Sequence, residues 1–282
     1  MNTYTTLISA RQLQDLLKAG NPPVVIEATF DLGDVQAGAR AWRAGHLPGS
    51  HYLHLDNDLS GQKTGRNGRH PLPARPDFAR TLGRLGITPE TQVVALDRQG
   101  GVYASRLWWM LRWMGHAAVA VLDGGMPAWT DAGGTLERDE VPADGESSYP
   151  ERAPLVPQTD SDRLARDLAR VRLVDARAAE RFRGEVEPLD KAAGHIPGAL
   201  HRFFKDNLDA DGRFKPAAQL REEFQPLLAG SPAADVVHTC GSGVTACHNL
   251  LAMEHSGLTG SVLYPGSWSE WSSDPARPIA KG

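Results

Sequence analysis

The stretch VVHTCGSGVTACHNLLAM, residues 236–253, joins three patterns. An apolar, β-branched run leads to Cys240, a loop with two glycines follows, and an amphipathic run continues without a break. β-branched apolar runs favour buried strands, whereas apolar residues at helical spacing favour an amphipathic helix. The stretch therefore predicts a strand, a tight loop that begins at Cys240, and a helix.

The predicted loop is suited to hold a negative charge beside Cys240. Gly241 and Gly243 permit backbone dihedral angles that other residues avoid, so successive backbone N–H groups can turn toward one point as an anion-binding nest. The N-terminus of the following helix adds partial positive charge, and thiolates are stabilised at such positions. We expect Cys240 to be a nucleophile. The alternative is that it is a small, buried apolar side chain.

The chain repeats itself. RAGHLPGSHYLHL (43–55) returns as KAAGHIPGALHRFF (191–204), TQVVALDRQGGVYAS (91–105) as ADVVHTCGSGVTAC (234–247), and LDGGMPAW (122–129) as YPGSWSEW (264–271). Three segments in one order at a nearly constant offset predict two copies of one domain rather than a solenoid array. Asp97 stands in the first copy where Cys240 stands in the second. Because a carboxylate cannot perform thiol chemistry, we expect the first copy to be catalytically inactive.

Short apolar runs alternate with helical patterns in both halves. The predicted strands are residues 24–28, 93–97, 118–122, 171–176, 235–239 and 261–264, and the predicted helices are 9–20, 75–86, 102–115, 160–169, 216–228 and 244–256. This alternation predicts an α/β fold with two tandem domains, each a small parallel sheet flanked by helices. Ligands of such sheets bind outside the carboxyl ends of the strands, where we expect Cys240.

Composition limits the domain boundaries and the partners. We expect an N-terminal domain over residues 1–136, a Pro-, Gly- and charge-rich linker over 137–158, and a catalytic C-terminal domain over 159–282. The net charge of −4 gives no reason to expect nucleic acid or an anionic membrane as a partner. We find no secretory signal and no apolar run long enough to span a bilayer. Two cysteines make a disulfide framework implausible, so we expect a reducing, cytoplasmic setting.

Several motifs together resemble the two-domain sulfurtransferases of the rhodanese superfamily, over nearly the whole chain. They are the GHLPG and GHIPG turns, CGSGVTA, DGGMPAW, and RFRG before the second turn. The resemblance implies that Cys240 carries the transferred sulfur as a persulfide. The loop residues that would bind substrate and stabilise the persulfide are Gly241, Gly243, Val244 and Thr245. No metal or organic cofactor is implied, and the histidines and cysteines show no zinc-like spacing.

The loop sequence separates the subfamilies of this superfamily. CGSGVT resembles the mercaptopyruvate sulfurtransferases, whereas thiosulfate sulfurtransferases tend to have a cationic pair where this chain has Gly241 and Ser242. The resemblance therefore favours 3-mercaptopyruvate as the donor, with thiosulfate as the alternative. Arg181 matches the family's substrate-binding arginine, and its guanidinium can bind a carboxylate bidentately. Leu189 stands where a second arginine is usual, and Lys191 or Arg183 would compensate only in part.

The resemblance also implies a proton relay. Ser242 matches the loop serine, and His70 and Asp56 match the histidine and the acid proposed to act with it. Such a relay could manage the proton that the leaving enolate takes up. Otherwise His70 is a solvated loop residue, Asp56 a turn or cap residue, and Arg181 an exposed helix residue. The expected reaction is ping-pong, with cyanide, a thiol or a thioredoxin-like protein as the acceptor.

Two other functions compete with this interpretation. A cysteine phosphatase needs Cys-x5-Arg, and the sixth residue after Cys240 is Ala246, so we set that function aside. A non-catalytic module that relays a persulfide between partners remains open, and turnover of small donors would separate it from an enzyme. We expect structural roles for Cys247 and for His46 and His195, which occur in both copies.

Overall fold

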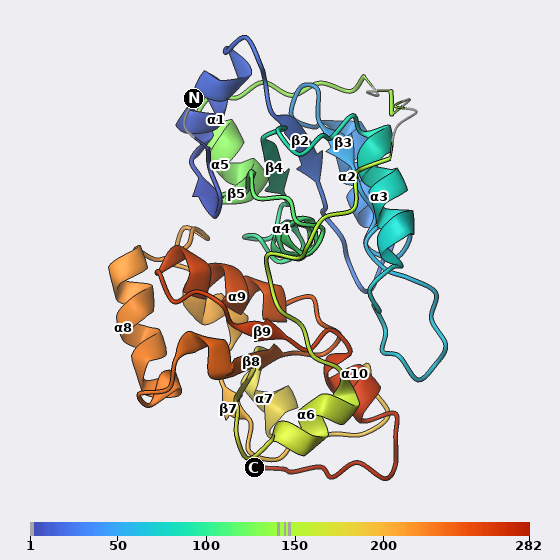
Figure 1. Ribbon diagram of the computed structural model, residues 1–282. Coiled ribbons are helices and arrows are strands. Elements are labelled where there is room, and N and C mark those ends of the chain that lie inside the picture. Colours follow the sequence, from blue (N-terminus) through green and yellow to red (C-terminus); the bar gives the residue numbers. More distant parts are fainter. Residues whose placement is uncertain (1–2, 140–141, 144, 146–147) are drawn as a thin grey trace. The chain divides into compact units, whose positions relative to one another are not determined.

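A computed structural model describes residues 3–139, 142–143, 145 and 148–282 (Figure 1). The chain divides into two compact units. Unit 1 comprises residues up to Ser60, Pro73–Leu155 and Ala210–Arg213, and unit 2 comprises Gly61–Leu72, Val156–Asp209 and Phe214–Gly282. Residues 61–72 therefore belong to the compact unit that contains Cys240, although the chain enters them from unit 1.

Unit 1 contains a parallel five-stranded sheet in the order β1-β5-β4-β2-β3. The strands are β1 Leu7–Ile8, β2 Val24–Glu27, β3 His51–Tyr52, β4 Val93–Leu96 and β5 Val119–Leu122. The helices are α1 Ala10–Leu17, α2 Ala37–Ala44, α3 Arg75–Arg84, α4 Ala104–Trp113 and α5 Gly125–Asp131. Helices α1 and α5 pack Leu13 and Trp129 on the sheet core that includes Val94. Helix α4 also packs against β4 and β5, and its Trp108 and Trp109 are buried.

Unit 2 repeats this arrangement with a parallel sheet in the order β7-β6-β8-β9. Its strands are β6 Arg172–Asp175, β7 Leu200–His201, β8 Val236–Thr239 and β9 Val262–Leu263. Its helices are α6 Ser161–Asp167, α7 Ala179–Phe182, α8 Ala217–Leu228, α9 Ala246–His255 and α10 Ser267–Trp271, with 3-10 turns η1 Phe204–Asn207 and η2 Ala233–Asp235. Helices α6 and α10 lie on one side of the sheet, and α8 and α9 lie on the other (Figure 1).

Every strand and helix predicted from the sequence is present, and both sheets are parallel as predicted. Helix α1 shows why: Ser9 and Gln12 form a reciprocal capping box that starts the helix where the sequence predicts. The elements without a prediction are β1, β3, β7, α2, α5, α7 and α10 and the 3-10 turns η1 and η2. Most of these are two-residue strands or short helices, which are too short to show a period.

The repeated Gly-His turns have the same structural role in both units. Nδ1 of His46 lies 2.8 Å from the carbonyl oxygen of Trp42, and the two rings stack at 4.0 Å. His195 makes the same pair of contacts with Phe182, at 2.8 Å and 4.0 Å. The structural role predicted for these histidines is confirmed.

The predicted linker, residues 137–158, includes residues 140–141, 144 and 146–147, which lie outside the described residues. Among its described residues, Glu137 exchanges two backbone hydrogen bonds with His46. Tyr149 is buried, and its hydroxyl lies 3.1 Å from Nδ1 of His116. These residues therefore pack on unit 1. No helix in the described part of the chain is long and apolar enough to cross a membrane.

Candidate active site

Cys240 lies directly after β8, at the carboxyl end of a central strand of the unit 2 sheet. Residues 240–245 form the loop between β8 and α9, and Cys240 is 1% exposed. Neither Cys240 nor Cys247 forms a disulfide. Cys247 is buried in α9, as expected for a packing residue. The fold therefore places a buried thiol at the edge of the sheet where ligands of parallel sheets bind.

The loop directs a backbone donor at the Cys240 sulfur. The N–H of Gly243 points to Sγ of Cys240 at 3.1 Å. Gly243 has a φ of 76°, and a Cβ there would lie 2.2 Å from the carbonyl oxygen of Pro265, so this turn requires glycine. From α10, Oγ of Ser267 accepts the N–H of Cys240 at 3.1 Å. The Gly243 N–H thus contacts the sulfur, and Ser267 at the start of α10 fixes the backbone of Cys240.

The equivalent loop of unit 1 holds a carboxylate in a backbone nest. Asp97 accepts four backbone N–H groups at 2.8–3.0 Å, from Gln99, Gly101, Tyr103 and Ala104. The repeat aligns these donors with residues 242, 244, 246 and 247. An aspartate Oδ and the outer sulfur of a cysteine persulfide are the same number of bonds from Cα. The unit 1 loop therefore displays how this turn surrounds an anion at that distance.

Ser242 and His70 form a close pair within unit 2. Nδ1 of His70 lies 2.7 Å from Oγ of Ser242, and both side chains are buried. His70 is held there because segment 61–72 docks on unit 2, where the N–H of Arg69 donates to Oγ of Ser269 at 2.7 Å. The structure thus brings together two of the predicted relay residues, although they are separated by 172 positions.

Asp56, the predicted third relay residue, belongs to unit 1. It follows β3, and its backbone N–H donates to Nδ1 of His54 at 3.1 Å. The predicted partnership of Asp56 with His70 stays a prediction.

Arg181 lies in α7, within a cluster of charges beside the loop. Nη2 of Arg181 donates to Glu187 at 2.7 Å and to Asp190 at 3.2 Å. Arg69 donates to the same Asp190 at 3.1 Å. Burial, and then the charge of Glu187, raise the pKa of the Asp190 carboxyl above its ordinary value, although both arginines oppose this shift.

A second buried cation, Arg177, lies near the thiol. Its guanidinium is held by Asp175 at 2.7 Å and by Glu187 at 3.4 Å, and it lies 4.9 Å from the ring centre of Trp268. Burial alone would lower the pKa of Arg177. Asp175, Glu187 and the nearby Cys240 outweigh this effect and raise the pKa above its ordinary value. Arg177 therefore stays charged in this part of the site.

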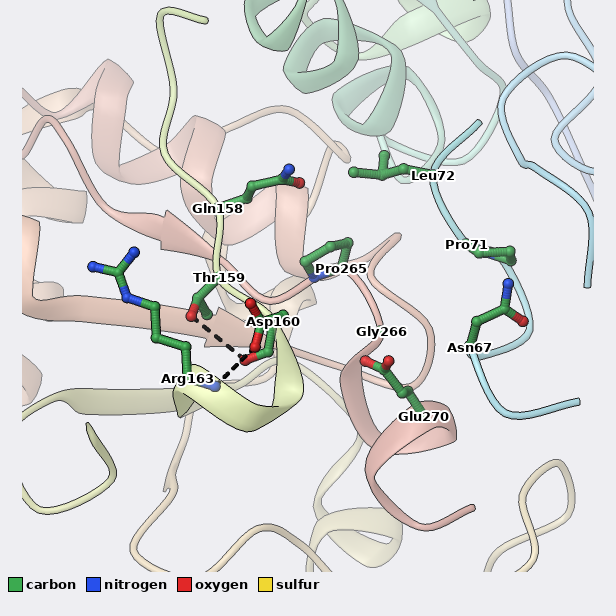
Figure 2. A pocket seen from close by; sticks show the side chains of 10 residues that line it. All are labelled: Asn67, Pro71, Leu72, Gln158, Thr159, Asp160, Arg163, Pro265, Gly266 and Glu270. Carbon is green, nitrogen blue, oxygen red and sulfur yellow. Dashed lines mark hydrogen bonds between the residues drawn. The ribbon is translucent and has the colours of Figure 1, made fainter. Parts of the chain in front are cut away.

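A pocket of about 310 Å³ lies elsewhere on unit 2 (Figure 2). Asn67 and Pro71, from segment 61–72, face Glu270 and Thr159 across it. None of its lining residues is a predicted site residue. We therefore place the chemistry at the Cys240 loop rather than in this pocket. Among the described residues, no three or more His, Cys, Asp or Glu side chains are grouped to hold a metal ion.

Comparison with known proteins identifies the family. The model of the rhodanese-like domain matches the chain twice, over residues 9–132 and 160–274. The chain belongs to the rhodanese family. The two matched rhodanese-like domains correspond to the two halves of the sequence repeat, and Cys240 lies in the second.

Relatives of this rhodanese-family chain span its whole length. It is 44% identical to a probable 3-mercaptopyruvate sulfurtransferase of Pseudomonas aeruginosa, over 98% of both chains. It is 37% identical to a putative thiosulfate sulfurtransferase of Mycobacterium tuberculosis, over 98% of this chain and 97% of the other. The solved 3-mercaptopyruvate sulfurtransferase of Leishmania major matches with a TM-score of 0.84 at 27% identity, over 95% of this chain and 74% of that one.

Three residues near the Cys240 loop were not singled out from the sequence: Arg69, Arg177 and Ser267. Arg177 follows β6, so its place at the carboxyl end of a strand was a usable signal. Ser267 aligns in the repeat with Gly125, and both have a left-handed φ, 53° and 58°. A serine at a glycine position was therefore a second signal. Arg69 gave no local signal beyond its place before His70.

Proposed function

We propose that this rhodanese-family chain is a sulfurtransferase that takes sulfur from 3-mercaptopyruvate onto Cys240 and passes it to a thiophilic acceptor. The observation that carries the proposal is the Cys240 loop. Its thiol lies at the end of β8 with the Gly243 N–H directed at the sulfur, and the same turn in unit 1 surrounds the Asp97 carboxylate with four N–H groups. The names of the relatives support the same chemistry.

In the first step, the Cys240 thiolate attacks the sulfur of 3-mercaptopyruvate. An S–S bond forms, the C–S bond breaks, and its electron pair passes to carbon as the enolate of pyruvate. The proton of the donor's thiol ends on that carbon, so a persulfide anion and pyruvate result. In the second step, cyanide or a thiolate attacks the outer sulfur and regenerates the Cys240 thiolate. With cyanide the product is thiocyanate.

Ser242 and His70 manage the proton in this proposal. Their 2.7 Å contact supports it, because a hydrogen-bonded pair can carry a proton from the donor's thiol to the enolate. Asp56 is proposed as the acid that orients His70. The N–H groups of Gly241, Gly243, Val244 and Thr245 are proposed to stabilise the persulfide. Of these, Val244 aligns with a donor of the Asp97 nest, Gly101. Arg181 is proposed to hold the donor's anionic group.

Thiosulfate is the second candidate donor. The observation in its favour is that Arg69 and Arg181 both approach Gly241, so the loop has two cations nearby although its own sequence has none. A dianion gains more from two cations than a monoanion does. A thioredoxin-like protein or a small thiol is the proposed physiological acceptor. A reducing, cytoplasmic setting is proposed because neither cysteine is in a disulfide.

The test is steady-state turnover with 3-mercaptopyruvate and with thiosulfate in parallel, with cyanide as the acceptor. We expect a larger kcat/KM for 3-mercaptopyruvate, and no turnover of either donor by Cys240→Ser. Cys247→Ser is the matched control, because Cys247 is the other buried cysteine of the segment, and it should retain turnover. Turnover by Cys240→Ser would refute the mechanism. A preference for thiosulfate would reverse the donor assignment, and no turnover of either would favour a relay module.

A further inference from the structure

The carboxylate of Asp190 lies between two guanidinium groups. Nη1 of Arg69 donates to Oδ1 at 3.1 Å, and Nη2 of Arg181 donates to Oδ2 at 3.2 Å. Each carboxylate oxygen thus has its own cation. Two arginines that share one carboxylate in this way are equally suited to a carboxylate from a small molecule, because charge-assisted hydrogen bonds of this kind do not depend on the rest of the anion.

The same two guanidinium groups lie against the Cys240 loop. A Cβ on Gly241 would lie 2.9 Å from Nη2 of Arg69 and 3.3 Å from Nη1 of Arg181. The absence of a side chain at 241 therefore lets both cations approach the backbone next to Cys240. A carboxylate held between them would lie near the reactive sulfur.

Space for a ligand adjoins this pair of arginines. Arg69 and Asp190 line a pocket of about 220 Å³ together with Lys63, Leu189 and Lys191. Ser269 also lines it and donates its N–H to the carbonyl of Gly241 at 2.8 Å. In the described structure, Nε of Arg69 is buried without a hydrogen-bond partner, so this guanidinium has donor capacity that Asp190 does not use.

The Asp190 carboxylate is not ideally stabilised between the guanidinium groups of Arg69 and Arg181. Its side chain is 4% exposed, and burial is the main reason that its pKa lies above the ordinary value. A carboxylate that loses hydration without full compensation is a weaker competitor than its short distances suggest.

We propose that Arg69 and Arg181 form a clamp for the carboxylate of an α-keto acid donor, and that Asp190 occupies this clamp until the donor displaces it. The α-keto acid identity rests on the proposed function. In this arrangement Arg69, from segment 61–72, supplies the second guanidinium. The second arginine that is usual after Arg181 is Leu189 in this chain. Leu189 itself is 41% exposed, and Arg183 pairs with Glu185.

The test measures pyruvate binding by isothermal titration calorimetry and the KM for 3-mercaptopyruvate in four variants of the full chain. Arg69→Ala should weaken pyruvate binding by about tenfold or more and raise KM more than it lowers kcat, because one charge-assisted pair is lost. Arg69→Lys should recover part of the loss, since an ammonium keeps the charge but not the fork. Asp190→Asn should tighten pyruvate binding. Arg66→Ala, in an exposed position of the same segment, should match the wild type.

Two results would overturn the clamp. One is unchanged pyruvate affinity in Arg69→Ala, and the other is weaker binding in Asp190→Asn, which would make Asp190 a support for the arginines rather than a competitor. Failure of the proposed function looks different. The wild type would then bind pyruvate with the expected dependence on Arg69 and Asp190, yet would not turn over 3-mercaptopyruvate. Absence of pyruvate binding in the wild type would refute the clamp directly.

Discussion

Ser267 combines an unfavourable backbone with a useful side chain. Its φ of 53° is left-handed, which costs a residue with a Cβ about 1 kcal/mol. Its Oγ accepts the N–H of Cys240 at 3.1 Å and donates to the carbonyl of Tyr264 at 2.9 Å. The equivalent residue of unit 1, Gly125, has the same backbone without this side chain. Ser267 therefore has a strained backbone, and its side chain fixes the backbone of Cys240.

Two substitutions separate the backbone strain from the hydrogen bonds. Ser267→Gly removes the strain and the hydrogen bonds together, whereas Ser267→Ala removes only the hydrogen bonds. Ser267→Ala should therefore be the less stable variant, by about 1 kcal/mol in denaturant unfolding. Both should lower kcat for sulfur transfer, because the Cys240 backbone is no longer fixed. Equal stability of the two variants would mean that the left-handed backbone costs nothing here.

At the scale of an element, the Glu223 carboxylate of helix α8 ties this helix to neighbouring segments. Glu223 accepts from Arg202 at 2.8 Å and from Lys215 at 2.9 Å. Burial opposes ionisation, but the hydrogen bonds to Arg202, Lys215 and Gln219 prevail and lower the pKa of Glu223 to about 2. Because the folded value lies below the ordinary 4.5, Glu223 stabilises the fold above about pH 4.5 and loses this effect as the pH falls toward 2.

The corresponding prediction concerns how the free energy of unfolding falls at acidic pH. Glu223→Gln should lower the free energy of unfolding at neutral pH and flatten its dependence on pH between 4.5 and 2. Denaturant unfolding at several pH values measures both effects. Glu222→Gln is the matched control, because Glu222 is an exposed neighbour on the same helix and should leave the pH dependence unchanged. If the free energy of unfolding of Glu223→Gln depended on pH as in the wild type, other carboxylates would account for the loss of stability in acid.

At the scale of the whole molecule, each unit has its own buried core. Leu13, Val94 and Trp129 belong to one cluster, and Leu164, Val237 and Trp268 to another. The Asp97 carboxylate, which is fully buried, ties four backbone donors of unit 1 together. Removal of this carboxylate should therefore destabilise unit 1 more than unit 2.

Asp97→Asn tests this expectation. An amide keeps the shape but presents an N–H₂ group to backbone donors, so the variant should lose about 2 kcal/mol or more. Hydrogen exchange should report the loss in the amides of β4 and α4, with smaller changes in β8 and α9. Equal loss of protection in all four elements would mean that the two units open together.

The sequence by itself determined the duplication, the order of the main strands and helices, and the place of Cys240 at the end of a strand. These are local patterns of apolar residues, glycines and repeated motifs, and a single segment carries each of them. It also indicated Ser242, His70 and Arg181 through motifs. It gave no sign that Arg69 and Asp190 share one ion pair, because such a pair joins positions 121 residues apart and leaves no period.

Only the tertiary structure decided which side chains surround the thiol. Segment 61–72 docks on unit 2 and brings His70 to Ser242 across 172 residues. The turn before α10 brings Ser267 to Cys240, and Arg177, just after β6, lies close enough for Cys240 to influence its charge. These contacts are set by packing between distant segments. The physical reason is that side-chain hydrogen bonds and ion pairs depend on distance in space, whereas sequence patterns report only distance along the chain.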